Sequence, residues 1–118
     1  MIGLRSFQAR VRDWVIACFG PATADDREAT CGAFAEEAVE LLQASGYSEE
    51  AMIATVRRVY RGKPGQPRQE MGGTMTTLAA LAGAHRLDME GDGEAELARI
   101  WTKVEQIRAK KPGGTTPG

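Results

Sequence analysis

The sequence has few of the residues that carry zinc or disulfide chemistry. Its 118 residues include one histidine and two cysteines, and Cys18 and Cys31 form no CxxC pair. A structural zinc site needs four Cys or His ligands at close spacings, which this chain does not offer. We therefore expect two small, buried or half-buried thiols in a reducing compartment.

A long apolar run and an excess of positive charge are also missing. No apolar stretch approaches the ~20 residues that span a bilayer, so we expect a cytoplasmic protein with no membrane partner. The 15 basic and 16 acidic residues give a net charge of −1. Such a balance provides no field for wrapping a nucleic-acid polymer. The charge is unevenly distributed, however, because no Lys or Arg lies between Arg27 and Arg57.

Helical periodicity fills most of the chain, and turn residues divide it. We expect a first amphipathic helix from Leu4 to Phe19, ending at Gly20-Pro21. Thr23 or Asp25 would cap a second helix, which Gly46 ends. The apolar stripe of this second helix is Phe34, Ala38, Leu41, Leu42 and Ser45.

Three further helices are expected beyond Gly46. The third opens at Ser48, the fourth runs from about Arg68 to His85, and the fifth follows a polar connection over residues 86–93. His85 would cap the C-terminal end of the fourth helix or compensate the helix dipole there. The apolar residues expected to face inward are, in order, Met52, Ile53, Val56, Val59 and Tyr60; Met71, Met75, Leu78, Leu81 and Ala82; and Leu97, Ile100, Trp101, Val104 and Ile107.

No period-two alternation of useful length competes with these helices. The sequence therefore predicts an all-α protein, with a four-helix bundle core and one additional short helix. We expect one domain over residues 1–111 and a disordered C-terminal tail over residues 112–118.

The most informative feature is a cluster of glutamates in the stretch of the chain that has no Lys or Arg. On a helix, Glu36 and Glu40 are i,i+4 neighbours and Glu37 and Glu40 are i,i+3 neighbours, so the three carboxylates share one side. Like charges at these spacings cost about 0.2–0.5 kcal/mol per pair. A divalent cation held by carboxylate oxygens would offset that repulsion. Oxygen ligands without His or Cys favour Mg²⁺, with Mn²⁺ as a substitute, and Mg²⁺ commonly binds substrate phosphates as well.

The chain at this point resembles the MazG-like all-α nucleoside triphosphate pyrophosphohydrolases. Their motif is EExxE on one helix and ExxD on a later helix. Residues 36–40 match the first half in full, and Glu70 matches the Glu of the second half. The resemblance runs from about Phe7 to Arg108 and includes the order of the helices.

This resemblance implies the chemistry of the site. Glu36, Glu37, Glu40 and Glu70 would bind Mg²⁺, and Glu37 and Glu40 would also orient or deprotonate the attacking water. The substrate would be a nucleoside triphosphate, cleaved between the α and β phosphates to a monophosphate and pyrophosphate. The family also implies a homodimer or homotetramer.

The sequence departs from the family pattern at one position. The Asp of ExxD is replaced by Gly73. Either one metal ligand is lost, or water, Thr74 or a residue of the fifth helix fills its place, with Glu105 as the candidate replacement acid. Gly72 and Gly73 leave two explanations open: room for a base, sugar or neighbouring helix, or a position in the first helical turn, where glycine costs little.

Four residues are predicted to contact substrate. Lys103, Arg108 and Lys63 would meet phosphate oxygens, with ordinary surface charge as the alternative for each. Trp101 would stack on the base. Core packing is the default interpretation of both tryptophans, Trp14 and Trp101, and stacking is the alternative for Trp101 alone.

Three functions remain open on the sequence alone. The first is a Mg²⁺-dependent nucleotide pyrophosphohydrolase. The second is a related helical nucleotide-binding or interaction module that cleaves slowly or not at all, because Gly73 replaces the acid. The third is a structural bundle in which the glutamates form a solvated face.

Overall fold

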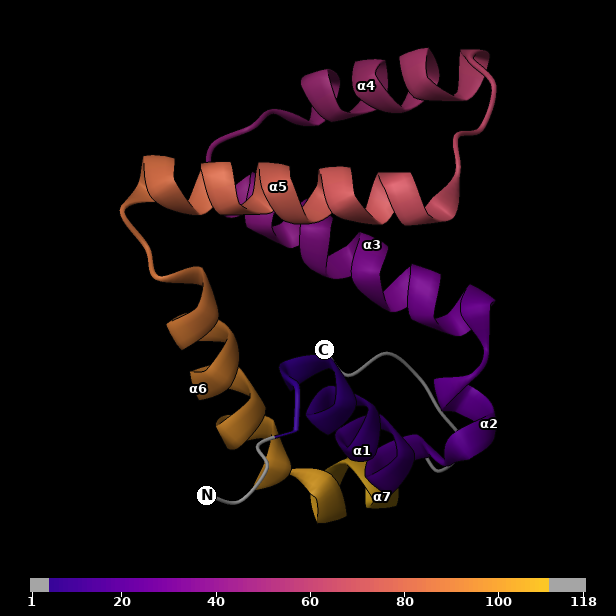
Figure 1. The fold of residues 1–118 in the computed structure, drawn as a ribbon, viewed down its shortest axis with the longest axis vertical. Helices are drawn as coiled ribbons and strands as arrows, with labels where there is room; N and C mark the ends of the chain where they lie inside the picture. Colours follow the sequence, from indigo (N-terminus) through magenta and orange to yellow (C-terminus); the bar gives the residue numbers. More distant parts are fainter. Residues whose placement is uncertain (1–4, 111–118) are drawn as a thin grey trace. The chain divides into compact units, whose positions relative to one another are not determined.

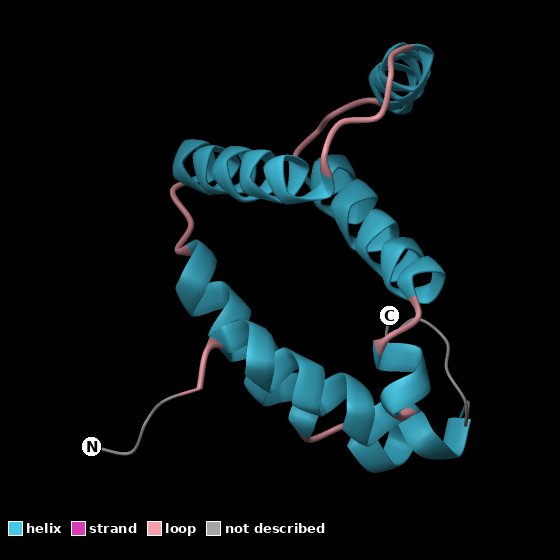
Figure 2. Ribbon diagram, turned by 45° about the vertical axis from the view of Figure 1, so that its right-hand side comes forward, coloured by secondary structure: helices cyan, strands magenta, loops and turns pink. Residues whose placement is uncertain are grey.

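The computed structural model describes residues 5–110, and these contain helices and connecting turns but no strand, which confirms the all-α prediction (Figures 1 and 2). The expected tail over residues 112–118 lies outside the described residues, as does Leu4. The helices are α1 (Phe7–Phe19), α2 (Pro21–Ala24), α3 (Arg27–Ala44), α4 (Glu49–Arg61), α5 (Pro67–His85), α6 (Met89–Trp101) and α7 (Val104–Lys110).

The chain divides into two compact units. One runs from the N-terminus to Ala38 and resumes at Gly93, and the other is Val39–Asp92. The first contains α1, α2 and α7 with most of α3 and α6, and the second contains α4 and α5.

The first unit has a small apolar core built on α1. Trp14, Cys18 and Leu97 are the buried residues, with 2%, 4% and 5% of their surface exposed. The indole Nε1 of Trp14 donates a hydrogen bond to the carbonyl of Ile100 at 2.9 Å, and its ring meets Phe19 edge-on. The hydrogen bond joins α1 to α6, and α1 also packs against α2 and α7.

The ends of several helices follow from local chemistry, as the sequence predicts. Gly20 ends α1 with φ of 90°, a conformation that costs glycine little, and Pro21 starts α2. Gly46 follows α3 with φ of 84°. Ser48 caps α4 by accepting a hydrogen bond from the amide of Ala51 at 3.1 Å.

The predicted cap of α3 is wrong. Neither Thr23 nor Asp25 fills this role, because a separate short helix, α2, occupies residues 21–24. The carboxylate of Asp26 instead accepts hydrogen bonds from the amides of Glu28 and Ala29, at 3.0 and 3.2 Å. Because α2 occupies residues 21–24, the cap of α3 is Asp26, one residue after Asp25 and three after Thr23.

The predicted fifth helix is also wrong in its bounds. α6 begins at Met89, inside the expected connection, because Asp88 accepts a hydrogen bond from the amide of Gly91 at 3.1 Å. A turn at Thr102-Lys103 then separates α6 from α7, and the Thr102 hydroxyl donates to the carbonyl of Arg99 at 2.6 Å. A side chain that bonds the preceding turn in this way offers the backbone an alternative to the helix.

The second unit has no buried residue among those described, which corrects the expected inward faces of two helices. On α4, half-buried Met52 is the least exposed of the five apolar residues predicted to face inward; on α5, Leu81 and Ala82 are half-buried. The residues of these two helices that are exposed instead of buried are Ile53, Val56, Val59 and Tyr60 on α4 and Met71, Met75 and Leu78 on α5.

Phe34 on α3, Trp101 on α6 and the thiol of Cys31 were also expected to be at least half-buried, and each is exposed. Periodicity identifies the apolar side of a helix but not what covers it. The four-helix bundle stays a prediction for this reason.

His85 lies at the end of α5, as predicted, and joins two helix ends of the second unit. Its Nε2 lies 2.7 Å from the hydroxyl of Ser45, the residue after α3. Arg86 follows in the left-handed region with φ of 59°, and its amide donates back to α5. A non-glycine residue there costs about 1–2 kcal/mol.

Candidate functional site

The three glutamates of the EExxE segment lie on one helix, α3, and all three are exposed. Glu36 and Glu40 are one turn apart, about 6 Å along the axis. Neither of them forms an ion pair with a Lys or Arg within residues 5–110. α3 therefore presents a concentrated negative charge to solvent, as the sequence predicts.

Glu70 lies in the first turn of α5, where the N-terminal end of the helix favours a negative charge. Pro67 starts this helix, and the carboxylate of Glu70 turns back over the preceding loop. It comes so close to Gly65 that a Cβ atom at position 65 would overlap the carboxylate. A glycine at position 65 thus permits this conformation of Glu70.

The predicted metal ligands are distributed over both units. Glu36 and Glu37 precede the boundary at Ala38, whereas Glu40 and Glu70 belong to Val39–Asp92. Among residues 5–110, no three His, Cys, Asp or Glu side chains come together in an arrangement that would hold a metal ion. The four-carboxylate site stays a prediction.

Gly73 lies in the second turn of α5, so the explanation that it sits in a first turn is wrong. A Cβ atom at position 73 would meet nothing within 4 Å, and the same holds at Gly72. The Thr74 hydroxyl donates to the carbonyl of Glu70 at 2.8 Å, so this group is already bonded to the helix backbone. The space for an acid at position 73 is present, although the acid is not.

Arg108, one of the predicted substrate residues, has an observable structural role. Its Nε donates to the carbonyl of Ala17 at 2.7 Å, and its guanidinium pairs with Glu105 at 3.3 Å. Arg108 thereby satisfies a carbonyl near the end of α1 and helps to attach α7. Glu105 is the residue named above as a replacement acid, and here it is the partner of Arg108.

The other predicted substrate residues are exposed. Lys63 lies in the loop between α4 and α5, and Lys103 lies in the turn between α6 and α7. Trp101, at the end of α6, has 42% of its surface exposed, so core packing does not describe it. All three remain accessible to a ligand, which is what their predicted roles require.

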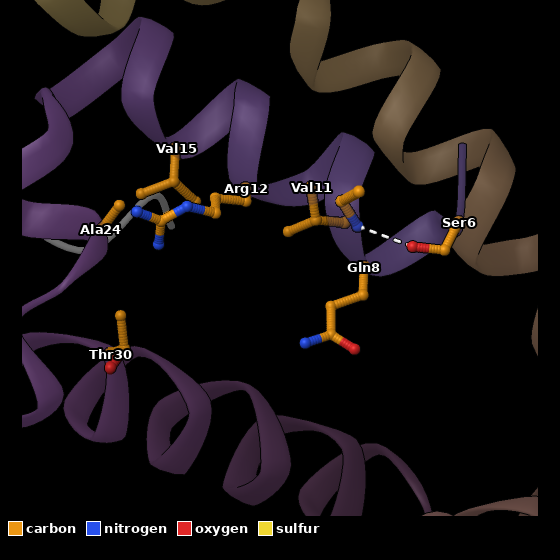
Figure 3. A pocket seen from close by; sticks show the side chains of 8 residues that line it. Ser6, Gln8, Val11, Arg12, Val15, Ala24 and Thr30 are labelled. Carbon is orange, nitrogen blue, oxygen red and sulfur yellow. Dashed lines mark hydrogen bonds between the residues drawn. The ribbon is translucent and has the colours of Figure 1, made fainter.

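A cavity of about 460 Å³ lies in the first unit and was not predicted from the sequence (Figure 3). Its walls come from α1 and the start of α3, and Arg12 is the one charged side chain among the eight that line it. Arg12 pairs with Asp25 at 2.8 Å. The lining residues are Ser6, Gln8, Ala9, Val11, Arg12, Val15, Ala24 and Thr30.

One lining residue of the cavity, Thr30, lies on the same face of α3 as Glu37. Thr30 and Glu37 are seven residues apart, which is two turns of an α-helix and about 10 Å of rise. No motif in the sequence marks Arg12, which lies beside the apolar stripe of α1. The sequence does not show that Arg12 and Thr30 line the same cavity, because this depends on how α1 and the start of α3 are placed in the fold.

The described helices include none that is both long and apolar enough to cross a membrane. Comparison of the chain with known protein families, with curated proteins and with solved structures finds no match. The resemblance to the MazG-like enzymes therefore depends on the motif residues themselves.

Proposed function

We propose that this protein is a Mg²⁺-dependent nucleotide pyrophosphohydrolase of the cytoplasm, with the MazG-like fold and a four-helix bundle core. The observation that carries the proposal is the exposed run of carboxylates on α3, with Glu36 and Glu40 lacking a cationic partner among the described residues. Hydrated Mg²⁺ is the ion that such a surface favours, and its open coordination positions suit phosphate oxygens.

In this mechanism the glutamates of α3 and Glu70 would hold Mg²⁺ against the triphosphate. Glu37 or Glu40 would accept a proton from the attacking water, because a carboxylate beside a metal-bound phosphate is a suitable general base. Lys63, Lys103 or Arg108 would neutralise phosphate charge, and Trp101 has the exposed ring that stacking on a base requires.

A release assay tests this proposal. Purified protein with Mg²⁺ and a panel of nucleoside triphosphates is expected to release pyrophosphate. Glu40→Gln is expected to abolish the release, because a neutral amide of similar size replaces the charged carboxylate ligand. Glu28→Gln is the matched control, because Glu28 is exposed on the same helix but lies in its first turn, outside the EExxE segment. Equal loss in both variants would contradict the assignment.

A second candidate function is a nucleotide-binding module with little or no hydrolysis. The observation that favours it is Gly73, where the family has an acid. Because a Cβ atom at position 73 meets nothing, Gly73→Asp should be accommodated on α5. Nucleotide binding by the wild type without pyrophosphate release, together with release by Gly73→Asp, would establish this alternative.

We also propose that the protein acts as a homodimer or homotetramer. The support is the unit Val39–Asp92, which has no buried residue. An isolated helix of 13 residues such as α4 is marginal in water, so α4 needs apolar contacts beyond those that its own unit provides.

A further inference from the structure

α4 has an apolar stripe along nearly its whole length. At 100° per residue, its five members fall within about 120° of the helix circumference. Exposure increases toward the C-terminal end, from half-buried Met52 to Val56 at 48% and Tyr60 at 84%. The members of this α4 stripe are Met52, Ile53, Val56, Val59 and Tyr60.

The charges beside the α4 stripe are arranged asymmetrically. Glu49, in the first turn, falls on the stripe itself, whereas Glu50, Arg57 and Arg61 fall along one flank, with the acids near the start of the helix and the bases near its end. The other flank carries Thr55, whose hydroxyl lies 3.3 Å from the hydroxyl of Tyr47. Arg58 lies on the back of the helix, away from the stripe.

This pattern is complementary to itself only when two copies of α4 run in opposite directions. In an antiparallel pair, each flank faces the same flank of the other helix, so Glu50 of one copy would lie between Arg57 and Arg61 of the other. In a parallel pair, the charged flank would face the uncharged flank, and no such pairs would form. A two-fold axis also brings the stripe of one copy against the same stripe of the other copy, as an isologous interface requires.

We propose that the α4 stripe is the contact between two copies of this chain, paired antiparallel about a two-fold axis near Thr55. The inference does not depend on nucleotide hydrolysis, because α4 carries none of the proposed metal ligands. A helix of 13 residues is about 20 Å long. Such a surface is smaller than the ~800 Å² per partner of a standard interface, so we expect the association through α4 to be weak and to depend on protein concentration.

Two reciprocal charge variants test the pairing by sedimentation equilibrium from about 1 to about 500 µM protein. In the double variant Arg57→Glu/Arg61→Glu, the three acids on the flank of one copy face the same three acids of the other copy. In Glu50→Arg, three bases on the flank face three bases. Each variant alone is expected to raise the dimer dissociation constant at least about tenfold over the wild type. Mixed in equal amounts, the two variants are expected to form a heterodimer at least about tenfold tighter than either homodimer, because the three flank positions of one copy are then all acidic and those of the other copy are all basic.

Two controls separate this effect from loss of folding. Arg58→Glu makes the same change of charge on the back of α4 and is expected to leave dimerisation unchanged. Val56→Glu places a charge in the middle of the stripe and is expected to give a monomer with unchanged helical circular dichroism. Restored pairing in the mixture cannot arise from misfolded chains.

Other outcomes overturn the inference. A wild type that stays monomeric at the highest concentration shows that another part of the same chain covers the stripe. A monomer that binds vesicles of anionic phospholipid shows that a membrane surface covers it. A dimer that is unaffected by Val56→Glu, or that Arg58→Glu weakens as much as the double variant, places the contact elsewhere.

Discussion

At the scale of single residues, Trp14 is the residue that most firmly connects two helices. Its ring is buried beside Cys18 and Leu97, and its Nε1 donates to the carbonyl of Ile100. That carbonyl lies close to the end of α6, where the last carbonyl groups have no amide donor within the helix. Trp14 therefore contributes both apolar burial and the hydrogen bond of a backbone group.

Trp14→Phe is expected to lower the free energy of unfolding by about 1–3 kcal/mol, because the Ile100 carbonyl loses its donor and the smaller ring leaves space. Urea denaturation followed by circular dichroism measures this change. Trp101→Phe is the matched control, since this ring is exposed, and it should change stability by less than about 0.5 kcal/mol. Equal effects of the two substitutions would contradict the role of Trp14.

The ion pair of Arg10 with Glu94 joins α1 to α6 at the surface. Two hydrogen bonds of 2.7 and 2.6 Å link the guanidinium to both carboxylate oxygens. These bonds lower the pKa of Glu94 below its ordinary value. Because the pKa is lower in the folded chain, the stabilisation is present above the unfolded pKa and is lost as the pH falls through the folded value.

Glu94→Gln is therefore expected to lower the thermal midpoint at pH 7 but not at a pH below the folded pKa of Glu94. The decrease at pH 7 should be small, because both side chains are partly exposed to solvent. Thermal melts of the two proteins at a series of pH values measure the difference. Glu90→Gln, at an exposed glutamate of α6 without an ion pair in the described residues, should give a difference that does not vary with pH.

At the scale of helices, Asp26 is the residue that fixes the start of α3. Its carboxylate accepts from the amides of Glu28 and Ala29, and these two donors have no other acceptor within the helix. The position of every glutamate along α3 follows from this start.

Asp26→Ala is expected to cost about 0.5–2 kcal/mol of stability, because both amides lose their acceptor. Chemical denaturation measures the cost. Asp25→Ala removes only the exposed pair with Arg12 and should cost less, about 0–1 kcal/mol. A larger effect at Asp25 than at Asp26 would contradict the capping role of Asp26.

Helix ends that depend on a single residue were predictable from the sequence. Gly20, Gly46 and Ser48 each act through their own backbone or side chain, and the helices begin or end where these residues indicate. The turn at Thr102-Lys103 was not predictable, because neither glycine nor proline marks it.

The candidate site was predictable only as far as one helix extends. The spacing of Glu36 and Glu40 on α3 follows from helical geometry alone. Whether their carboxylates approach Glu70 depends on how separate helices pack, and neither periodicity nor motif spacing determines that. The same limit applies to α4 and α5. The residues that form the apolar face of each helix were predictable, but the residues that contact this face were not.

At the scale of the whole chain, the apolar core is confined to one unit. The three buried residues belong to α1 and α6, whereas Val39–Asp92 contributes none among the described residues. Stability is therefore expected to be distributed unevenly, with local opening easiest where few apolar contacts exist.

Backbone amides of α1 are expected to exchange with deuterium more slowly than those of α4 in dilute protein. Raising the protein concentration should slow exchange in α4 while leaving α1 unchanged, because association stabilises only the segment that it covers. Hydrogen exchange followed by mass spectrometry at two protein concentrations measures both rates. Equal protection of α4 and α1 in dilute protein would show that α4 is already covered within one chain.

The contrast between the two thiols has a practical consequence. Cys31 is exposed on α3, whereas Cys18 is buried in the core on α1, and burial raises the pKa of the Cys18 thiol. Because the thiolate is the reactive form, a maleimide should modify Cys31 promptly and Cys18 only when the core around α1 opens. The rate at which the second label is added, followed by mass spectrometry, therefore measures how fast the core opens and requires no substitution.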